Sequence, residues 1–130
     1  MRAAIISMII VALLAAGVCI LSVALIGHVS SEMDSMRTEV LALSDAGRMN
    51  DARLRLQQMA EAWKKHEPLL AILVSHDTLH EITGLIIEGH ANLSADDADD
   101  FSRSMALLGE ALRHLHVEEL PHLANILSVC

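Results

Sequence analysis

The chain has 130 residues and a formal net charge of −8 at pH 7, a length that suits one small domain with or without an anchor. Hydrophobic residues make up 53% of it and aromatic residues only 2%, so the excess is aliphatic, and most of it lies at the N-terminal end. Because phosphate binding needs a basic face, the acidic balance argues against nucleic acid as a partner.

The first predicted element is an apolar helix. The run from Ala3 to Val29 holds no charged side chain before His28, and about 20 apolar residues suffice to cross a bilayer core. A cleavable signal has an apolar core of only about 7–15 residues, and bulky Leu25 lies three positions before the best cleavage site, near Gly27. We therefore expect residues 1–29 to be an uncleaved transmembrane signal anchor, with the lipid bilayer as its surroundings.

Charge around this run predicts its orientation. Arg2 and the amino terminus precede it, whereas Glu32 and Asp34 follow it closely. Positive charge is retained on the cytoplasmic side and acidic residues count little. We expect a single-pass protein of the cell membrane with a cytoplasmic N-terminus and an extracytoplasmic bulk.

An amphipathic helical stem is predicted over residues 30–47. Apolar side chains recur there at spacings of three and four, as Val29, Met33, Met36, Val40 and Leu43. This period indicates that the anchor helix continues outside the membrane. Asp45 and Ala46 precede Gly47, which suits the left-handed position that ends a helix.

The remaining residues, 48–130, are predicted to form an extracytoplasmic helical domain. Asn50 is the expected cap of its first helix. That helix has an inward stripe of Ala52, Leu56, Met59 and Trp63. Pro68 lacks an amide donor and disfavours a helical residue before it, so we expect a break at His66–Glu67. Pro68 would then start a third helix that runs to about His90, with a stripe of Ile72, Leu79, Ile82, Ile86 and Leu93.

The sequence "NLS" is predicted to be a loop, and a fourth helix is expected to follow it. Ser94 with Asp97 resembles a capping box, and the acidic residues of "DDADD" suit the positive end of a helix. Calcium binding is the alternative there, but the Gly-centred loop of a known calcium site is missing. The inward face is predicted to be Ala98, Phe101, Met105, Leu108, Leu112 and Leu115. Pro121 would start a last short helix, with Leu123, Ala124 and Leu127 inward.

The predicted fold class is all-α, with the transmembrane helix continuing into a stem and a small antiparallel bundle of about four helices. Short loops make consecutive helices antiparallel. A domain of this size has a marginal core, so a membrane-protein partner or a second copy of the chain would complete its burial. Cys19 lies in the apolar run and Cys130 is the last residue, a separation that argues against an internal disulfide.

His76 and His80 form an H-D-x-x-H sequence with Asp77. One helical turn separates them, so both can bind one ion, but a catalytic zinc needs three protein ligands. The candidate third ligands are His66, Glu81, His90, His114 and His116, and the sequence selects none. Asp77 would also reach less far toward a metal-bound water than the Glu of zinc proteases. We expect a structural role, with His76 hydrogen-bonded near the core and His80 solvated; a metal-binding protein or zinc-dependent hydrolase is the alternative.

One spacing resembles a known family. Trp63, His66, Leu70, Leu73, His76 and Asp77 follow the pattern W-x-x-H-x-x-x-L-x-x-L-x-x-H-D, with Ile82 beyond it and "NIL" at 125–127. The chain is similar in this to a family of small bacterial proteins, domain-of-unknown-function family 4363. The resemblance implies a single N-terminal span and a helical domain in the cell envelope, and no activity. Pro68 departs from the pattern, and His80 is not part of it.

Trp63, His66 and His76 are a possible recognition or structural cluster. Trp63 and His66 lie three apart on one helix face, where their rings can meet. The structural interpretation is a core tryptophan whose indole N–H is bonded nearby. The functional interpretation is a recognition pocket. We expect no cofactor and no enzymatic activity, but an interaction or accessory module for another envelope membrane protein.

Overall fold

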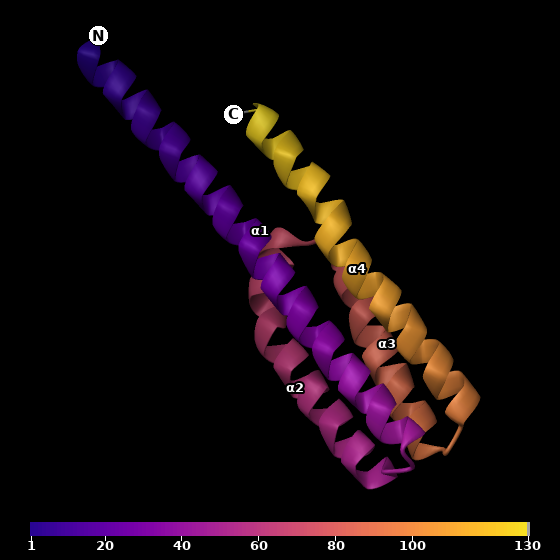
Figure 1. Ribbon diagram of the computed structural model, residues 1–130. Coiled ribbons are helices and arrows are strands. Elements are labelled where there is room, and N and C mark those ends of the chain that lie inside the picture. The colour runs from indigo at the N-terminus through magenta and orange to yellow at the C-terminus, as the bar shows by residue number, and fades with distance from the viewer. Residues whose placement is uncertain (130) are drawn as a thin grey trace.

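The computed structural model describes the backbone of residues 1–129 and the side chains of residues 1–115. The described residues form four helices: α1 (Arg2–Asp45), α2 (Met49–Leu73), α3 (His76–Ser94) and α4 (Ala98–Val129). Each packs against two others, in the pairs α1–α2, α2–α3, α3–α4 and α1–α4, so they close into an antiparallel bundle (Figure 1). The described residues contain no strand, and the predicted all-α class is confirmed.

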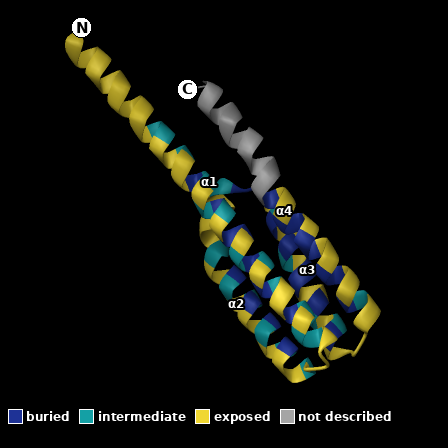
Figure 2. Ribbon diagram, in the orientation of Figure 1, coloured by how far each residue is buried: buried dark blue, intermediate teal, exposed yellow. Residues whose placement is uncertain are grey.

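The longest helix, α1, has two different halves. Its N-terminal half projects beyond the bundle, whereas its buried residues begin at Ser22 and continue to Val40 (Figures 1 and 2). The segment that was predicted as a stem is therefore itself the first helix of the four-helix bundle. The expected end of the helix is confirmed: α1 stops at Asp45 and Gly47 adopts a φ of 77°.

The course of α2 corrects two predictions. It begins at Met49 rather than after Asn50, whose side chain instead accepts a hydrogen bond from Arg53. It also passes through Pro68 and ends at Leu73, so the predicted break at His66–Glu67 is wrong. Proline removes one backbone hydrogen bond from a helix interior. Trp63 and Leu70, on either side of Pro68, are both buried, and their packing offsets that loss.

The expected stripe of α2, from Ala52 to Trp63, is buried and confirmed. The break lies instead at Val74, whose backbone is extended, and Ser75 caps α3 by accepting a hydrogen bond from the Thr78 amide. Ile72 therefore lies in the last turn of α2 and is exposed, so its placement in an inward stripe was wrong. The rest of that stripe is buried as predicted: Leu79, Ile82, Ile86 and Leu93.

The turn between α3 and α4 also differs from the prediction. The sequence "NLS" is helical, because α3 continues to Ser94, and the cap of α4 is Asp97, whose Oδ1 accepts a hydrogen bond of 3.1 Å from the Asp100 amide. Asp96, between the helices, has a φ of 56°, a left-handed conformation that Asp tolerates better than most residues. Farther into α4, the Arg103 guanidinium is hydrogen-bonded to Asp100 and lowers the pKa of that carboxyl.

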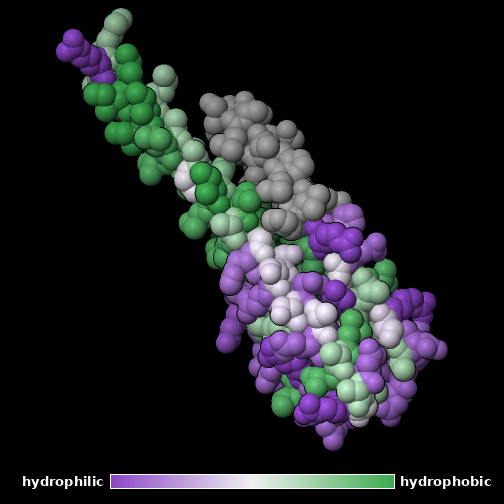
Figure 3. Space-filling view, viewed as in Figure 1, coloured by the Kyte–Doolittle hydropathy of each residue, from purple (hydrophilic) through white to green (hydrophobic). Residues whose placement is uncertain are grey.

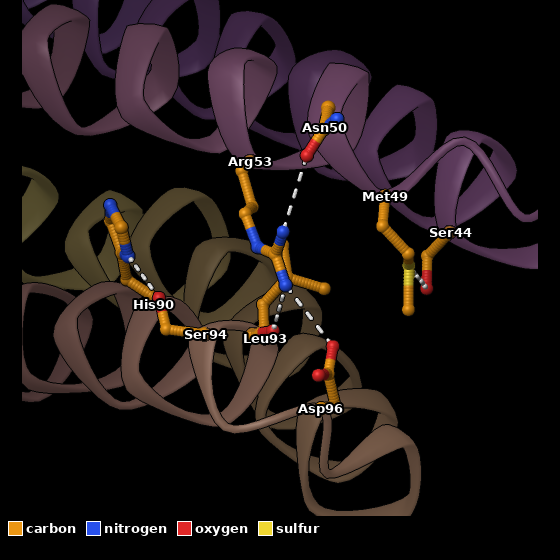
Figure 4. A network of polar contacts seen from close by, with 8 residues as sticks. All are labelled: Ser44, Met49, Asn50, Arg53, His90, Leu93, Ser94 and Asp96. Atoms are coloured by element: carbon orange, nitrogen blue, oxygen red, sulfur yellow. Dashed lines mark hydrogen bonds and ion pairs between the residues drawn. The ribbon is translucent and has the colours of Figure 1, made fainter.

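Arg53 of α2 ties this turn to the rest of the bundle (Figure 4). Its Nη2 donates to the Leu93 carbonyl at 3.4 Å and to Asp96 Oδ1 at 3.1 Å, and its Nη1 donates to Asn50 Oδ1 at 3.3 Å. One side chain thus links the start of α2 to the end of α3, at the end of the bundle farthest from the projecting half of α1 (Figure 1).

The last helix, α4, is continuous to Val129, so the predicted new helix at Pro121 is wrong. Ala98 is exposed, contrary to its predicted place on the inward face. The other five residues of that face are buried and confirmed: Phe101, Met105, Leu108, Leu112 and Leu115. The side chains of Leu123, Ala124 and Leu127, and Cys130, lie outside the described residues.

Candidate functional site

The projecting half of α1 is an exposed apolar surface. Within α1, eleven large apolar side chains before Ser22 are exposed: Ile5, Ile6, Met8, Ile9, Ile10, Val11, Leu13, Leu14, Val18, Ile20 and Leu21. They cover this half of the helix, which contrasts with the bundle, where hydrophilic residues predominate among scattered hydrophobic ones (Figure 3). A continuous apolar patch of this kind is unfavourable in water. By length and composition, α1 can cross a membrane, as an anchor helix or as a signal sequence.

The apolar run and the bundle overlap along α1. Ile26 and Val29 belong to the apolar run, yet they are 2% and 0% exposed and lie in the core of the bundle. Ser30 is also buried, and its Oγ donates a hydrogen bond of 2.7 Å to the Leu112 carbonyl of α4. The bundle therefore begins where the exposed apolar surface ends.

A pair of histidines flanks one carboxylate just beyond this point. Glu32 Oε2 of α1 lies 3.1 Å from His66 Nε2 of α2 and 3.9 Å from His28 Nε2. The His66 side chain is 28% exposed and the others more so. Partly exposed ion pairs of this kind contribute little to stability, about 0–1 kcal/mol. The contact places His66 against α1, a partner 34 residues away that no local spacing in the sequence indicates.

Trp63 lies in the core. It is 2% exposed, and its Nε1 donates a hydrogen bond of 2.9 Å to Thr83 Oγ1 of α3. Beside it, a groove of about 350 Å³ runs between α2 and α3. Its lining is Gln57, Ala60, Glu61, Trp63, Lys64, Glu67, Thr83, Ile86 and Ile87. The lining of the groove is thus partly apolar and partly polar.

The structure places the members of the possible recognition cluster in different surroundings. Trp63 contacts Thr83, His66 contacts Glu32, and the His76 ring lies beside that of His80. His76 is exposed at the first residue of α3, so the expectation of a hydrogen bond near the core is wrong for this residue. It became exposed because α3 starts at His76 instead of at Pro68.

The histidine pair is a partial ligand set. The ring centroids of His76 and His80 are 6.3 Å apart, and both side chains are exposed. Within residues 1–115, no group of three or more His, Cys, Asp or Glu side chains is arranged to hold a metal ion. Catalytic zinc needs three protein ligands, so a third one would have to come from elsewhere.

A second groove, also of about 350 Å³, separates α1 from α4. Arg37 lies along it, with its Nε 2.9 Å from Asp34 Oδ1 and its Nη1 donating to the Met105 carbonyl at 3.4 Å. A Cβ atom at Gly109 would lie 2.7 Å from Arg37 Cζ, so an alanine there would displace the guanidinium. This groove was not predicted from the sequence. The small residues Gly27 and Gly109, which line it, were the sequence feature that could have indicated it.

Comparison with known proteins gives one match. Residues 20–126 fit the family model described as Domain of unknown function (DUF4363), which confirms the resemblance drawn from the Trp63–His66–His76 spacing. No curated protein and no solved structure matches the chain. The matched segment begins two residues before Ser22, where burial in the bundle starts. The matched residues cover nearly all of the bundle, and the family description states no activity.

Proposed function

The chain belongs to the DUF4363 family, and from this premise we propose that it is a membrane-anchored, non-catalytic accessory module that binds another membrane protein. One observation carries the proposal: α1 is an uninterrupted helix whose first half is an exposed apolar rod and whose second half is part of the bundle core. Such a helix holds a folded domain directly at a bilayer surface, without a flexible linker.

Retention of the anchor is supported by the core. Cleavage near Gly27 would separate Ile26 from the bundle and leave a new charged terminus two residues before buried Val29. A signal peptide that is removed contributes nothing to the mature domain. Ile26 is 2% exposed and therefore contributes to the core of the bundle, which favours retention of this segment after export.

The proposed orientation places the N-terminus in the cytoplasm and the bundle outside it. Arg2 precedes the apolar run, and positive charge is retained on the cytoplasmic side. The proposal gives the histidines no catalytic role: His76 and His80 are exposed on the first turns of α3, and His66 pairs with Glu32.

The groove between α2 and α3 is the proposed contact for a protein partner. Ala60, Ile86 and Ile87 are apolar residues of its lining, and Glu61 and Lys64 are charged residues of the same lining. An apolar centre with a polar rim is the usual anatomy of a protein interface. Ile87 is 64% exposed there, so a partner would remove it from water.

Photocrosslinking in native membranes tests the partner. A photoreactive amino acid at Ile87 is expected to give one discrete adduct, and one at Leu107, an exposed residue of α4 outside the groove, is expected to give none. Mass spectrometry of the adduct distinguishes a second copy of the chain from a different protein. Failure of Ile87 to crosslink, or the same adducts from both positions, would contradict the groove as the contact.

Alkaline extraction tests the anchor separately. An uncleaved anchor keeps the full-length chain in the membrane pellet, because alkali strips proteins that are held by polar contacts and leaves helices that span the bilayer. Release of the chain into the supernatant, or a mature N-terminus near Gly27, would contradict the anchored form.

A further inference from the structure

The corner between α2 and α3 lies beside the point where α1 leaves the bundle (Figure 1). The contact between His66 and Glu32 fixes the register of α2 against antiparallel α1. Six residues beyond His66 is Ile72, and six residues before Glu32 is Ile26. Because both helices rise by about 1.5 Å per residue, Ile72 lies level with Ile26, within the apolar run of α1.

This level corresponds to the boundary of the bilayer. The uncharged run from Ala3 to Gly27 is 25 residues, or about 37 Å of helix. A bilayer hydrocarbon core is only about 30 Å thick. If Arg2 remains at the cytoplasmic surface, the last turns of this run, around Ile26, lie in the interface between hydrocarbon and water. Any side chain of the bundle at that level meets the same interface.

Two large apolar side chains are exposed at this corner. Leu69 is 49% exposed and Ile72 is 78% exposed, and their spacing of three places them on one face of α2. Scattered exposed apolar residues are ordinary on a protein surface. The position of this pair distinguishes it, because Leu69 and Ile72 lie at the end of the bundle from which an apolar helix emerges.

The charges near the corner are mixed. Lys64 and Lys65 are exposed on α2 within two or three turns of Ile72, where long stems can extend toward lipid phosphates. Asp77 and Glu81 of α3 are exposed close to the same corner. The local charges therefore oppose one another, and attraction to anionic lipid is not the expected source of binding. The apolar side chains are the part of the corner that suits a bilayer.

We propose that Leu69 and Ile72 insert into the lipid interface and form a second membrane contact beside the anchor helix. This contact rests on the proposed anchored form of the chain. A single helix through a bilayer leaves the bundle free to rotate about the helix axis and to tilt. A second contact, formed by a different helix, fixes which face of the bundle is turned toward the membrane and leaves the α2–α3 groove at Ile87 accessible from the side.

Depth-dependent fluorescence quenching of the full chain tests this contact. Cys19→Ala and Cys130→Ser remove the native thiols, and Ile72→Cys supplies one site for an environment-sensitive dye. The matched control is Leu54→Cys, an exposed leucine near the opposite end of the same helix. Both labelled chains are placed in vesicles of phosphatidylcholine alone, with circular dichroism and Trp63 emission confirming that each remains folded.

At position 72, we expect strong quenching by a nitroxide attached to lipid near the headgroup and several-fold weaker quenching by iodide than at position 54. The reverse pattern is expected at position 54. Equal quenching by iodide at the two positions would overturn the proposal. Protection of position 72 from iodide without quenching by the lipid nitroxide would also overturn it, because a second copy of the chain would then cover the corner.

Flotation of the same vesicles separates this proposal from the anchor on which it depends. A chain that floats with the vesicles while its dye at position 72 remains in water retains the anchor and overturns only the corner contact. A chain that does not float with the vesicles would overturn both the anchor and the corner contact. A second label, at Leu69→Cys, is expected to give the same pattern as position 72, and a water-exposed dye there would contradict the insertion of this face.

Discussion

Trp63 holds α2 to α3 through one hydrogen bond. Its Nε1 donates to Thr83 Oγ1 at 2.9 Å, while the ring fills the core with only 2% of the residue exposed. A buried indole usually finds such an acceptor, and the structural interpretation of Trp63 was based on this tendency. The identity of the acceptor, 20 residues farther along the chain, follows from how α2 packs on α3.

Replacement of Thr83 isolates this bond. We expect Thr83→Val, which keeps the side-chain shape but removes the acceptor, to lower the free energy of unfolding by about 1–2 kcal/mol, because the indole N–H loses its partner. Thr83→Ser retains an acceptor and is expected to lower the free energy of unfolding by less than Thr83→Val does. Urea denaturation followed by the emission of Trp63, the only tryptophan, measures both. A valine variant at least as stable as the serine variant would contradict the bond's role.

The histidines show how the burial of a residue depends on where a helix begins. His76 and His80 keep the one-turn spacing that suggested a shared ion, with ring centroids 6.3 Å apart. Both are exposed, at the N-terminal end of α3, which starts at His76. The spacing was correct from the sequence, whereas the burial of His76 was not, because burial depends on where the preceding helix stops.

At the scale of the elements, proline was the main source of error. The helix break was predicted at His66–Glu67, just before Pro68, but α2 continues to Leu73, and α4 likewise continues past Pro121. A proline costs an isolated helix about 3 kcal/mol, which makes it a reasonable boundary signal. Within a bundle, the burial of residues on both sides, such as Trp63 and Leu70, outweighs that local cost.

The start of α4 gives a second test at this scale. The sequence favoured Ser94 as its cap, whereas the structure gives that role to Asp97, whose Oδ1 accepts from the Asp100 amide at 3.1 Å. We expect Asp97→Ala to lower the free energy of unfolding by about 1 kcal/mol. Ser94→Ala, on the last residue of α3, is expected to change it by less than about 0.5 kcal/mol.

Thermal or urea unfolding of the two alanine variants, followed by circular dichroism, decides between the caps. Asp97→Asn is the matched control, because its side-chain oxygen can still accept from the helix amides. Greater destabilisation by Ser94→Ala than by Asp97→Ala would favour the boundary that the sequence suggested and contradict the one in the structure.

At the scale of the whole molecule, α1 joins the anchor to the fold. The same helix has an exposed apolar half and a half that supplies Ile26, Val29, Met33, Met36 and Val40 to the core. Its period of three and four was recognised in the sequence as a stem. That this stripe faces α2 and α4, and closes the bundle, is a property of the packed structure.

Truncation of α1 measures how far the bundle extends into the apolar run. We expect a fragment that starts at Ser31 to unfold with a free energy about 3–6 kcal/mol lower than one that starts at Ser22, because it lacks two fully buried aliphatic side chains, Ile26 and Val29. It also lacks Ser30, whose Oγ bonds the Leu112 carbonyl.

Urea denaturation of the two purified fragments, followed by helical circular dichroism, provides the comparison. The full chain in detergent is the control, and the longer fragment should match its unfolding midpoint. Equal midpoints for the two fragments would show that residues before Ser31 are not part of the bundle, and would remove the structural argument for an uncleaved anchor.

The sequence by itself determined the all-α class, the apolar leading helix, its end shortly before Gly47, and most of the inward faces of α2, α3 and α4. These features depend on the spacing of apolar residues and on local backbone preferences, which are carried by residues close together in the chain. The resemblance to a family without a known activity was also present in the spacing of Trp63, His66 and His76.

Only the tertiary structure decided the helix boundaries at Leu73 and Asp97, the pairing of His66 with Glu32, and the position of Ile72 level with Ile26. The pairing of His66 with Glu32 and the level of Ile72 depend on residues far apart in sequence. The Asp97 cap is a local contact with the Asp100 amide, and its use in place of Ser94 depends on how far α3 extends. Burial of Trp63 and Leu70 on either side of Pro68 outweighs the local cost of that proline, and for this reason α2 ends at Leu73 and not before Pro68.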